Sequence, residues 1–384
     1  MVSTIKGSAP GKILWLGGYS VLERPNIGFV TTVNSRVYVE ATRNASGRIE
    51  IDAPQFGSRI EGIVEKNGRI MADVDDKLKL VFTCVEVTLR YAVSVGRELS
   101  GISITTKSDP EILYKNIGGK IVKSGLGSSA AVSVAAIGTL IKLFEIDDPD
   151  NQKTHKLAQL AHSLATGKVG SGFDVASATF GSIIYVRYSP SIITALPKEF
   201  SNEELFNLIN SEWDYSIEKM ILPNSFIPVM ANFSGEGTST HASVSKVFEF
   251  KKESLEEYES IISAINSANL DALKALKKLS EMLPENVIEE FVHAFDIGRA
   301  ATKELGKKSG VDIEDDYATD LIEESKKNGA LVAKLPGSGG RDAIVALTKD
   351  TIQERRLREF WGSRKDLEII DISFSDRGFE YDIL

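Results

Sequence analysis

A stretch rich in glycine and serine, residues 123–131, has the residue types that hold a phosphate group. It reads Lys123-Ser124-Gly125-Leu126-Gly127-Ser128-Ser129-Ala130-Ala131 and runs into the small apolar residues of 132–141, which predicts a tight loop opening a buried helix. The first amides of a helix lack intrahelical partners and carry partial positive charge, and glycines let a ligand approach the backbone. Serine hydroxyls can cap the helix or contact an anion or its metal ion. The pattern indicates a phosphate site, with a well-capped core helix as the alternative.

Two other segments carry charged residues suited to the same chemistry. Near the N-terminus, the Pro-Gly pair of Pro10-Gly11-Lys12 predicts a turn that presents the lysine at the start of a short apolar strand. A second glycine-rich segment, 167–178, contains Lys168 and Asp174 and again ends in small apolar residues. For either lysine, a solvated loop side chain is the alternative interpretation.

A third glycine-rich segment, 336–340, lies between two short apolar runs and precedes Arg341. Three such loops, each joined to regular structure, suggest one phosphate-binding cleft assembled from distant parts of the chain. Arg341 is a reserve candidate for binding a substrate phosphate, and a local ion pair with Asp342 is the alternative.

Phosphate-binding motifs of other protein classes are missing or out of context. The chain has no Walker sequence, G-x-x-x-x-G-K-[ST], and lacks the H-R-D and D-F-G elements of protein kinases. Residues 125–130 match the dinucleotide fingerprint G-x-G-x-x-A, and Asp147 and Asp148 follow about 20 residues later. That fingerprint requires a hydrophobic strand before it and an acidic residue that ends a second strand. Because 118–123 is a poor strand and 140–148 resembles the end of a helix, a dinucleotide-binding fold is disfavoured.

The composition limits the class of protein. The 384 residues suffice for two domains, and a content of 42% hydrophobic and 26% charged residues is typical of a globular protein. The formal net charge of −9 argues against a general nucleic-acid partner, which requires a basic surface. The single cysteine, Cys84, excludes an internal disulfide framework. Because we find neither a signal-peptide pattern nor an apolar run of membrane-spanning length, we expect a cytoplasmic protein without a membrane partner.

Residue patterns predict strands and helices around these loops. Strands are expected where β-branched residues alternate or cluster, and helices where apolar residues recur at helical spacing. The predicted strands are 27–42, 49–52, 102–106, 183–188, 226–233, 331–335, 343–347 and 367–372. The predicted helices are 78–95, 151–166, 201–212 with a capping box of Ser201 and Glu204, and most of 254–327 with breaks near Asn266, Pro284 and 306–311. The pattern changes around Pro223-Asn224, which favours a domain boundary there.

Three of these segments, in this order and with these separations, resemble the three motifs of the GHMP kinases, a family named after galactokinase, homoserine kinase, mevalonate kinase and phosphomevalonate kinase. The segment 10–22 is similar to the first motif, 123–131 to the second, an ATP-phosphate loop, and 334–347 to the third. The resemblance implies an α+β fold with two domains, the first like domain 2 of ribosomal protein S5 and the second ferredoxin-like. The active site is then expected in the cleft between an ATP-binding domain, 1–222, and a second domain, 223–384.

Within the family, the segment 167–176 is most similar to that of the phosphomevalonate kinases, as are Leu22-Glu23 and Thr238-Ser239-Thr240. The resemblance implies phosphorylation of (R)-5-phosphomevalonate to (R)-5-diphosphomevalonate with ATP and Mg²⁺, a step of isoprenoid synthesis, by a monomer or a homodimer. One alternative is another GHMP kinase that acts on mevalonate or a similar small alcohol. The other is a non-catalytic nucleotide-binding protein of this fold, and the retention of Lys12 and Asp174 argues against it.

The resemblance also implies a role for each matching residue. Lys12 and Asp174 are the expected catalytic residues, Lys12 as the cation for the transferring γ-phosphate and Asp174 to orient Lys12, hold the metal ion or take a proton. Ser129 is the expected Mg²⁺ ligand, with Ser128 as its alternative. The expected ATP-binding residues are Lys123, Ser124, Gly125, Leu126, Gly127, Ser128, Ser129 and Ala130. The expected substrate-binding residues are Lys12, Tyr19, Lys168, Ser171, Asp174, Ser239, Gly337, Ser338, Gly339 and Gly340.

Two positions depart from the family pattern. Gly18 stands where many members carry a glutamate, and the metal-binding glutamate of mevalonate kinases falls near Ser163.

The chemistry of the acceptor affects how much Lys12 and Asp174 each contribute to catalysis. A phosphate monoester has a second pKa of about 6, so its acceptor oxygen is largely anionic at neutral pH. We therefore expect charge neutralisation by Lys12 to contribute more to catalysis than proton abstraction by Asp174.

Overall fold

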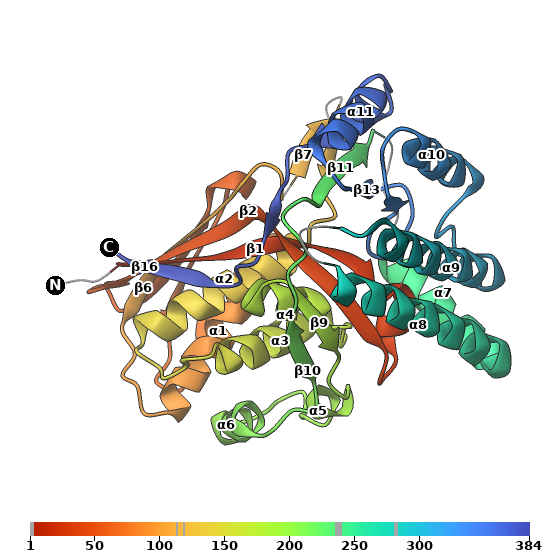
Figure 1. The fold of residues 1–384 in the computed structure, drawn as a ribbon. Coiled ribbons are helices and arrows are strands. Elements are labelled where there is room, and N and C mark those ends of the chain that lie inside the picture. Colours follow the sequence, from red (N-terminus) through yellow and green to blue (C-terminus); the bar gives the residue numbers. More distant parts are fainter. Residues whose placement is uncertain (1–3, 113, 118–119, 235–239, 280–282) are drawn as a thin grey trace.

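The computed structural model describes residues 4–112, 114–117, 120–234, 240–279 and 283–384, and Figure 1 shows their arrangement. One region is built on a large sheet with helices against one face, and a second region is built on a smaller sheet with further helices around it. The two ends of the chain lie close together at the edge of the large sheet, because the last strand pairs with the first.

Two long strands form the centre of the large sheet. β1 (Thr4–Leu16) and β2 (Ile27–Asn44) run antiparallel and are mostly buried, and their β-branched residues favour extended structure. The strand order is β10-β9-β2-β6-β3-β4-β5, while β1 and β15 also pair with β2 and β16 pairs with β1. The remaining strands of this sheet are β3 (Arg48–Ala53), β4 (Ser58–Val64), β5 (Ile70–Ala72), β6 (Gly101–Ser108), β9 (Ile183–Val186), β10 (Ser216–Lys219), β15 (Phe374–Ser375) and β16 (Glu380–Ile383).

A layer of helices packs against this sheet (Figure 1). α2 (Ser128–Leu143) is buried on most sides, as its small apolar residues predict, and contacts both β1 and β2. The helices beside it are α1 (Lys79–Ser94), α3 (Gln152–Thr166) and α4 (Phe173–Phe180), and smaller elements are α5 (Ser191–Thr194), α6 (Asn202–Asn210) and the 3₁₀ helices η1 (Gly18–Leu22) and η2 (Pro54–Phe56). Immediately before α2, β7 (Tyr114–Ile117) and β8 (Lys120–Lys123) form a separate hairpin. This antiparallel hairpin differs from the parallel sheet that a dinucleotide fingerprint requires.

The smaller sheet has the ferredoxin-like strand order. Its strands are β11 (Ile227–Phe233), β12 (Val332–Lys334), β13 (Ala343–Thr348) and β14 (Leu367–Ile370), paired in the order β12-β13-β11-β14. With α10 (Asp316–Lys327) and α11 (Thr351–Gly362), they form the βαββαβ arrangement of that fold. Three longer helices, α7 (Thr240–Glu253), α8 (Leu255–Lys278) and α9 (Glu285–Ser309), are inserted between β11 and β12.

Alternate residues of the smaller sheet face two different cores. Met230 and Ala343 point toward the core shared with the large sheet, while Ala231 and Ile344 pack with α10 and α11. The smaller sheet therefore lies directly against the N-terminal region, and Met230 and Ala343 lie beside Gly125 of the first glycine-rich loop.

The end of the chain returns to the large sheet after leaving the smaller one. β15 pairs with β2 and β16 pairs with β1, so residues 374–383 belong structurally with the N-terminal sheet. Phe379 lies in a slot where two glycines, Gly7 and Gly138, leave room for its ring: a Cβ placed on Gly138 would lie 2.5 Å from the ring. The boundary between 222 and 223 remains a prediction, and we propose that this last segment be grouped with the first domain.

Most predicted elements form, and the exceptions have identifiable causes. The Ser201–Glu204 capping box is present at the start of α6. The turn predicted at Pro10-Gly11 is wrong, because both residues lie inside β1 where its pairing with β2 shifts register, a place where a strand tolerates proline. The break predicted near Asn266 is also wrong. α8 continues through this residue, whose side-chain oxygen accepts a hydrogen bond from the Ile27 amide (3.2 Å).

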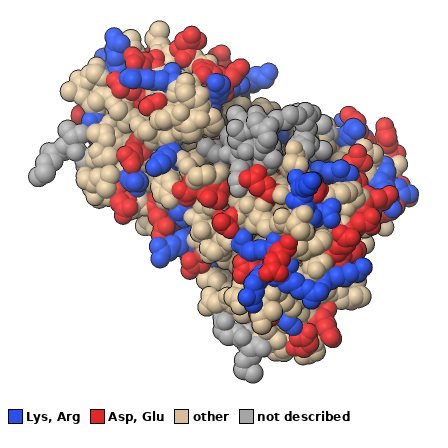
Figure 2. Space-filling view, turned by 90° about the horizontal axis from the view of Figure 1, so that it is seen from above, with Lys and Arg blue, Asp and Glu red and all other residues tan. Residues whose placement is uncertain are grey.

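Charge is distributed evenly over the face of the molecule shown in Figure 2, where acidic and basic side chains are interspersed. That this chain has no nucleic-acid partner remains a prediction, which rests on the net charge of −9. Among the described helices, none combines the length and apolar character that crossing a bilayer requires.

Replacing Phe379 with alanine should destabilise the protein by about 3 kcal/mol, because the glycine slot cannot collapse around the missing ring. Chemical denaturation measures this loss. The matched control is Tyr381→Ala, since Tyr381 stacks on Phe379 with ring centroids 6.3 Å apart but is 45% exposed. Equal losses for the two variants would show that the slot does not anchor the end of the chain.

Candidate active site

Among the strands that the structure describes, β1 pairs with β16 only over residues 5–8, so the second half of β1 has an edge that is free to bond outside the sheet, and its pairing with β2 shifts register twice. The first shift lies between Pro10 and Lys12, and the Lys12 amide donates to the Leu126 carbonyl of the first glycine-rich loop (2.9 Å). The second lies between Leu14 and Leu16 and excludes Trp15 from the ladder. Such irregularities bend a strand and redirect its side chains, and they often occur beside functional sites.

The first glycine-rich loop turns sharply into α2. Gly125 and Gly127 have φ values of +77° and +80°, which favour glycine. Among the residues that the structure describes, no side chain caps the first turn of α2, so the Ser128 and Ser129 amides remain available to an anion, while the Ala130 amide donates to the Gly127 carbonyl (3.1 Å). Ser129 is exposed on that turn, and its hydroxyl lies 3.4 Å from His162 Nε2.

Other members of this loop face the interior. Ser124 donates its hydroxyl hydrogen bond to the Ile112 carbonyl (2.7 Å), and the side chains of Leu126 and Ala130 are fully buried. Of Lys123 only the backbone, at the end of β8, is described. These residues therefore shape the loop, and any contact that Ser124, Leu126 or Ala130 makes with a phosphate would be through the main chain.

Lys12 passes directly over this loop. Its ammonium donates to the Gly125 carbonyl (3.0 Å) and lies 5.7 Å from the ring centre of Phe173. A Cβ on Gly127 would lie 2.8 Å from Lys12 Cε, so the glycine also makes room for the lysine stem. Burial lowers the pKa of Lys12, and the nearby carboxylate of Asp174 partly offsets this effect. The site thus places one buried cation between an uncapped helix start and a carboxylate.

Asp174 lies in the first turn of α4, where its carboxylate accepts a hydrogen bond from the Val175 amide (2.9 Å). The preceding loop is held in place by buried side chains: Gln159 donates to the Gly172 carbonyl (2.8 Å) and Tyr185 donates to the Ser171 carbonyl (3.2 Å). Lys168 lies on the exposed part of this loop, and partial burial lowers its pKa. The loop that carries Ser171 is therefore held in place, and Asp174 lies near enough to Lys12 to act on its charge.

Arg187 connects this second loop to the first motif and was not predicted. Arg187 is buried and directly follows β9. Its guanidinium donates to the Leu22 carbonyl and to the Gly170 carbonyl, both at 2.6 Å. Bidentate donation by a planar guanidinium fixes the relative orientation of two segments.

The third glycine-rich loop is fastened to η1 and to the segment before α10. Tyr19 donates its hydroxyl to the Ser338 carbonyl (2.9 Å), and burial raises the pKa of Tyr19 to about 12. The Gly340 amide donates to the Ile313 carbonyl (3.0 Å), and Gly339 packs on the same residue. The structure thus brings Tyr19 and the loop of residues 337–340 together.

Of the two remaining candidates, Ser239 and Arg341, Ser239 lies outside the described residues. Arg341 forms an ion pair with Asp315 (2.5 Å) and stacks on Tyr317, 4.6 Å from its ring centre. Because Asp315 also caps α10, Arg341 has a structural role. Its ion pair is with Asp315, 26 residues earlier in the chain, where the sequence suggested the neighbouring Asp342.

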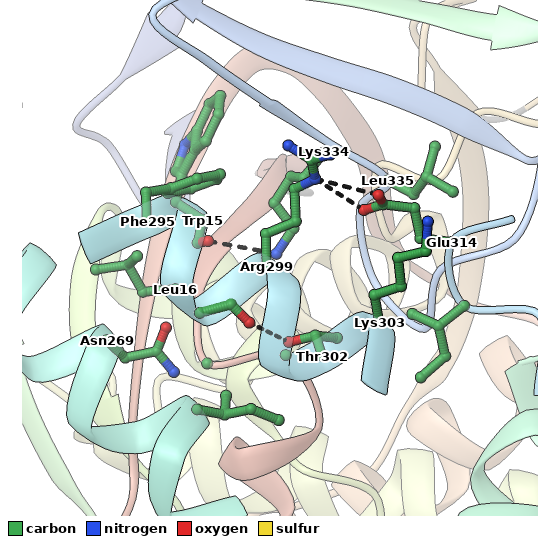
Figure 3. Close-up of a pocket in the computed structure, with 15 residues that line it drawn as sticks. Trp15, Leu16, Asn269, Phe295, Arg299, Thr302, Lys303, Glu314, Lys334 and Leu335 are labelled. Carbon is green, nitrogen blue, oxygen red and sulfur yellow. Dashed lines mark hydrogen bonds and ion pairs between the residues drawn. The ribbon is translucent and has the colours of Figure 1, made fainter. Parts of the chain in front are cut away.

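A cavity lies beside the third loop, between the end of β1 and α9 (Figure 3). Lys334, the last residue of β12, points into it and donates to the Trp15 carbonyl (3.3 Å). Arg299 and Glu314 form an ion pair on the same wall (3.0 Å). Lys334 was not predicted as a site residue, because nothing in the local sequence indicates that its partner lies in β1.

Oxygen donors suited to Mg²⁺ are present near Lys12. In the described part of the chain, no group of three or more His, Cys, Asp or Glu is arranged to hold a metal ion. Mg²⁺ bound with a nucleotide needs only one or two protein oxygens, because phosphates and waters complete its shell. The exposed hydroxyl of Ser129 and the carboxylate of Asp174 fit this requirement, whereas Ser163 is buried.

The chain matches two family models, "GHMP kinases N terminal domain" over residues 79–182 and "GHMP kinases C terminal" over residues 291–366. The phosphomevalonate kinase of Candida albicans is 32% identical, with 88% of each chain covered. That of Saccharolobus solfataricus is 33% identical, with 96% of each chain covered. A mevalonate kinase of Thermococcus sibiricus is 25% identical, with 91% of each covered.

Solved structures share the fold. Streptococcus pneumoniae phosphomevalonate kinase in complex with phosphomevalonate and AMPPNP superimposes with a TM-score of 0.74 at 18% identity, covering 96% of this chain and 99% of that one. The Methanococcus jannaschii mevalonate kinase gives a TM-score of 0.67 at 14% identity, covering 96% and 97%. The predicted two-domain α+β fold is confirmed. The chain therefore belongs to the GHMP kinase family, in its phosphomevalonate kinase branch.

Proposed function

We propose that this chain transfers the γ-phosphoryl group of ATP to (R)-5-phosphomevalonate, yielding (R)-5-diphosphomevalonate and ADP. The observation that most directly supports phosphoryl transfer is the position of the Lys12 ammonium. It donates to the Gly125 carbonyl, just before α2, and interacts electrostatically with the Asp174 carboxylate. The choice of acceptor is supported by relatives at 30% identity or more that are named phosphomevalonate kinases. Mevalonate is the nearest competing acceptor, since mevalonate kinases are also related.

ATP binding is proposed for residues 123–130. The free amides at the start of α2 and the positive-φ glycines give a concave array of N–H donors for the phosphates. Gly125, Gly127, Ser128 and Ser129 would contact the nucleotide directly, while Lys123, Ser124, Leu126 and Ala130 hold the loop in shape or contribute main-chain contacts. Mg²⁺ would be held by Ser129 and Asp174 and, when bound, would neutralise charge on the ATP phosphates.

The phosphoryl acceptor would lie between Lys12 and the second and third loops. In this arrangement Lys168 and Ser171 bind the acceptor phosphate, and the amides of residues 337–340 face the reacting groups. Ser239 is proposed as a further contact by its position in the sequence. Tyr19 would act through its bond to Ser338, which fixes the third loop.

Lys12 would stabilise the charge that develops as two anionic groups approach. Phosphoryl transfer depends mainly on positioning and electrostatic stabilisation, and a cation in a site of low water content acts strongly. Burial lowers the pKa of Lys12, so the site without ligands disfavours the charged form of the lysine. Binding of anionic phosphates beside it would stabilise this charged form. Asp174 would orient Lys12 more than abstract a proton, since the acceptor oxygen is already largely ionised.

Location in the cytoplasm and a monomeric or homodimeric state remain predictions. The proposed reaction is tested by ADP release with phosphomevalonate, mevalonate and homoserine as acceptors. We expect turnover with phosphomevalonate at a kcat/KM well above that for the two alcohols. Preference for mevalonate would reassign the substrate, and ATP binding without turnover on any acceptor would refute catalysis.

Replacing Lys12 with methionine should lower kcat by about 10³-fold, as expected for removal of a preorganised charge at the transferring group. Asp174→Asn should cost less than about 10²-fold, the lower end of what a general base contributes. Steady-state kinetics compare the two, with melting temperatures to verify folding. A larger decrease in kcat for Asp174→Asn than for Lys12→Met would show that Asp174 contributes more to catalysis than Lys12, against the proposal.

Gly127→Ala should weaken ATP binding by at least about tenfold, because the methyl group meets Lys12 Cε and displaces the lysine from the phosphate loop. The matched control is Gly167→Ala. Gly167 has a similar φ of +73°, and no atom lies within 4 Å of a Cβ built there. Both variants carry the left-handed backbone penalty of about 1–2 kcal/mol, so calorimetric titration with ATP isolates the contact with Lys12. Equal affinities in the two variants would contradict this role.

Lys168→Ala should raise the KM for phosphomevalonate by about tenfold, the effect of losing one charge-assisted hydrogen bond, and leave the KM for ATP unchanged. Lys168→Arg, which keeps the charge, should retain most of the affinity. If alanine at this position alters neither KM nor the dissociation constant for phosphomevalonate, Lys168 is a solvated loop residue.

A further inference from the structure

The second register shift of β1 and the third glycine-rich loop are joined by one side chain. Trp15 has no partner residue in the ladder with β2, and in the described part of the chain no strand pairs with the other edge of β1 beyond Ser8, so a partner outside the sheet can reach the Trp15 carbonyl. Lys334, the last residue of β12 and two residues before the third loop, provides that partner (3.3 Å; Figure 3). The bond spans the two sheets of the molecule, since β1 belongs to the large sheet and β12 to the smaller one.

The surroundings of Lys334 do not favour its charge. It lies on the wall of the cavity that also contains the Arg299–Glu314 ion pair, in which the side chains are 13% and 6% exposed. Glu314 attracts the ammonium, yet burial outweighs this attraction and lowers the pKa of Lys334 to about 8. At neutral pH the protein thus keeps a charged lysine that folding disfavours. Apolar side chains of similar length would fill the same space without this cost, so stability alone does not account for the residue.

The geometry of the third loop suggests what the lysine does. The loop is attached to the N-terminal region on both sides: Lys334 holds its start to Trp15, and Tyr19 holds Ser338 (2.9 Å). Trp15 lies in β1, the strand that carries Lys12, and Tyr19 lies in η1, which follows β1. The two bonds therefore relate the position of the loop to that of Lys12.

We propose that Lys334 is a positioning residue that holds the third glycine-rich loop in register with β1, so that the loop amides face the phosphorylated acceptor. This inference rests on the function proposed above. It concerns the acceptor side only, because the ATP loop is held separately through the Lys12 amide and Leu126.

Kinetics of Lys334→Met test the inference. We expect the KM for phosphomevalonate to rise about tenfold, equivalent to one hydrogen bond, while the KM for ATP changes less than about twofold. The melting temperature should stay the same or rise, because the variant removes a disfavoured charge. Lys334→Arg keeps a donor for the Trp15 carbonyl and should restore most of the lost affinity.

The matched control is Lys303→Met. Lys303 lines the same cavity, but its ammonium donates to Thr319 (2.5 Å) and pairs with Asp316 (3.7 Å), both in the C-terminal region. Among the described residues it forms no hydrogen bond to β1 that could position the loop. This variant should leave both KM values unchanged. An equal effect of the two methionine substitutions, or a rise in both KM values for Lys334→Met, would overturn the inference.

Amide hydrogen exchange of the peptide covering residues 331–345 provides a readout that does not depend on the reaction. Lys334→Met should accelerate exchange in this peptide relative to Lys303→Met, at equal global stability. Unchanged exchange would refute the positioning role even if the kinetics changed. If the wild-type protein does not act on phosphomevalonate, the proposed function fails, and the exchange experiment still decides whether Lys334 holds the loop.

Discussion

The rest of the structure depends on strand β1, because this strand is part of the large sheet and also bonds to loops of the site. A strand flanked on both sides uses its amides and carbonyls in two ladders, but among the described strands β1 pairs with β16 only over residues 5–8 and with β2 alone after that. Near each of its two register shifts with β2, a backbone group of β1 bonds to a segment of the site. The Lys12 amide donates to the first loop, and the Trp15 carbonyl accepts a hydrogen bond from Lys334, two residues before the third loop. One strand thereby relates loops that are more than 200 residues apart in the sequence.

Electrostatics imposes the second constraint. The proposed reaction brings two anionic groups together, so the site needs positive charge where little water can screen it. The protein supplies this charge as helix amides and as Lys12. Burial lowers the pKa of Lys12 and also that of the positioning residue Lys334. Neither charge is favoured by folding alone. Stability lost at these positions is expected where side chains are arranged for a ligand rather than for the fold.

Local patterns were sufficient to predict much of the fold. β-branched runs predicted β2 and β11, apolar periodicity predicted α1, and the capping box at Ser201 forms as expected. These signals depend on near neighbours in the sequence. The incorrect turn at Pro10-Gly11 and the incorrect break at Asn266 share a different cause: in both cases a partner far along the chain overrides a local preference. Tertiary contacts of this kind leave no periodic signal.

The same limit applies to the site. Residue type and spacing indicated the three glycine loops, because phosphate binding needs recognisable residues in short segments, and the family resemblance pointed to Lys12 and Asp174. Lys334 and Arg187 were missed, since each acts through a single backbone carbonyl in a distant segment. Arg341 looked available in the sequence, and only the structure shows that Asp315 engages it.

The most direct test of the central claim is a crystal structure of this protein with a non-hydrolysable ATP analogue and phosphomevalonate bound together. The claim predicts that Lys12 Nζ lies within hydrogen-bond distance of the γ-phosphate, that the analogue's phosphates contact the amides at the start of α2, and that the acceptor phosphate lies between Lys12 and the third loop. A ternary complex in which Lys12 still contacts only the Gly125 carbonyl, with the phosphates bound elsewhere, would contradict it.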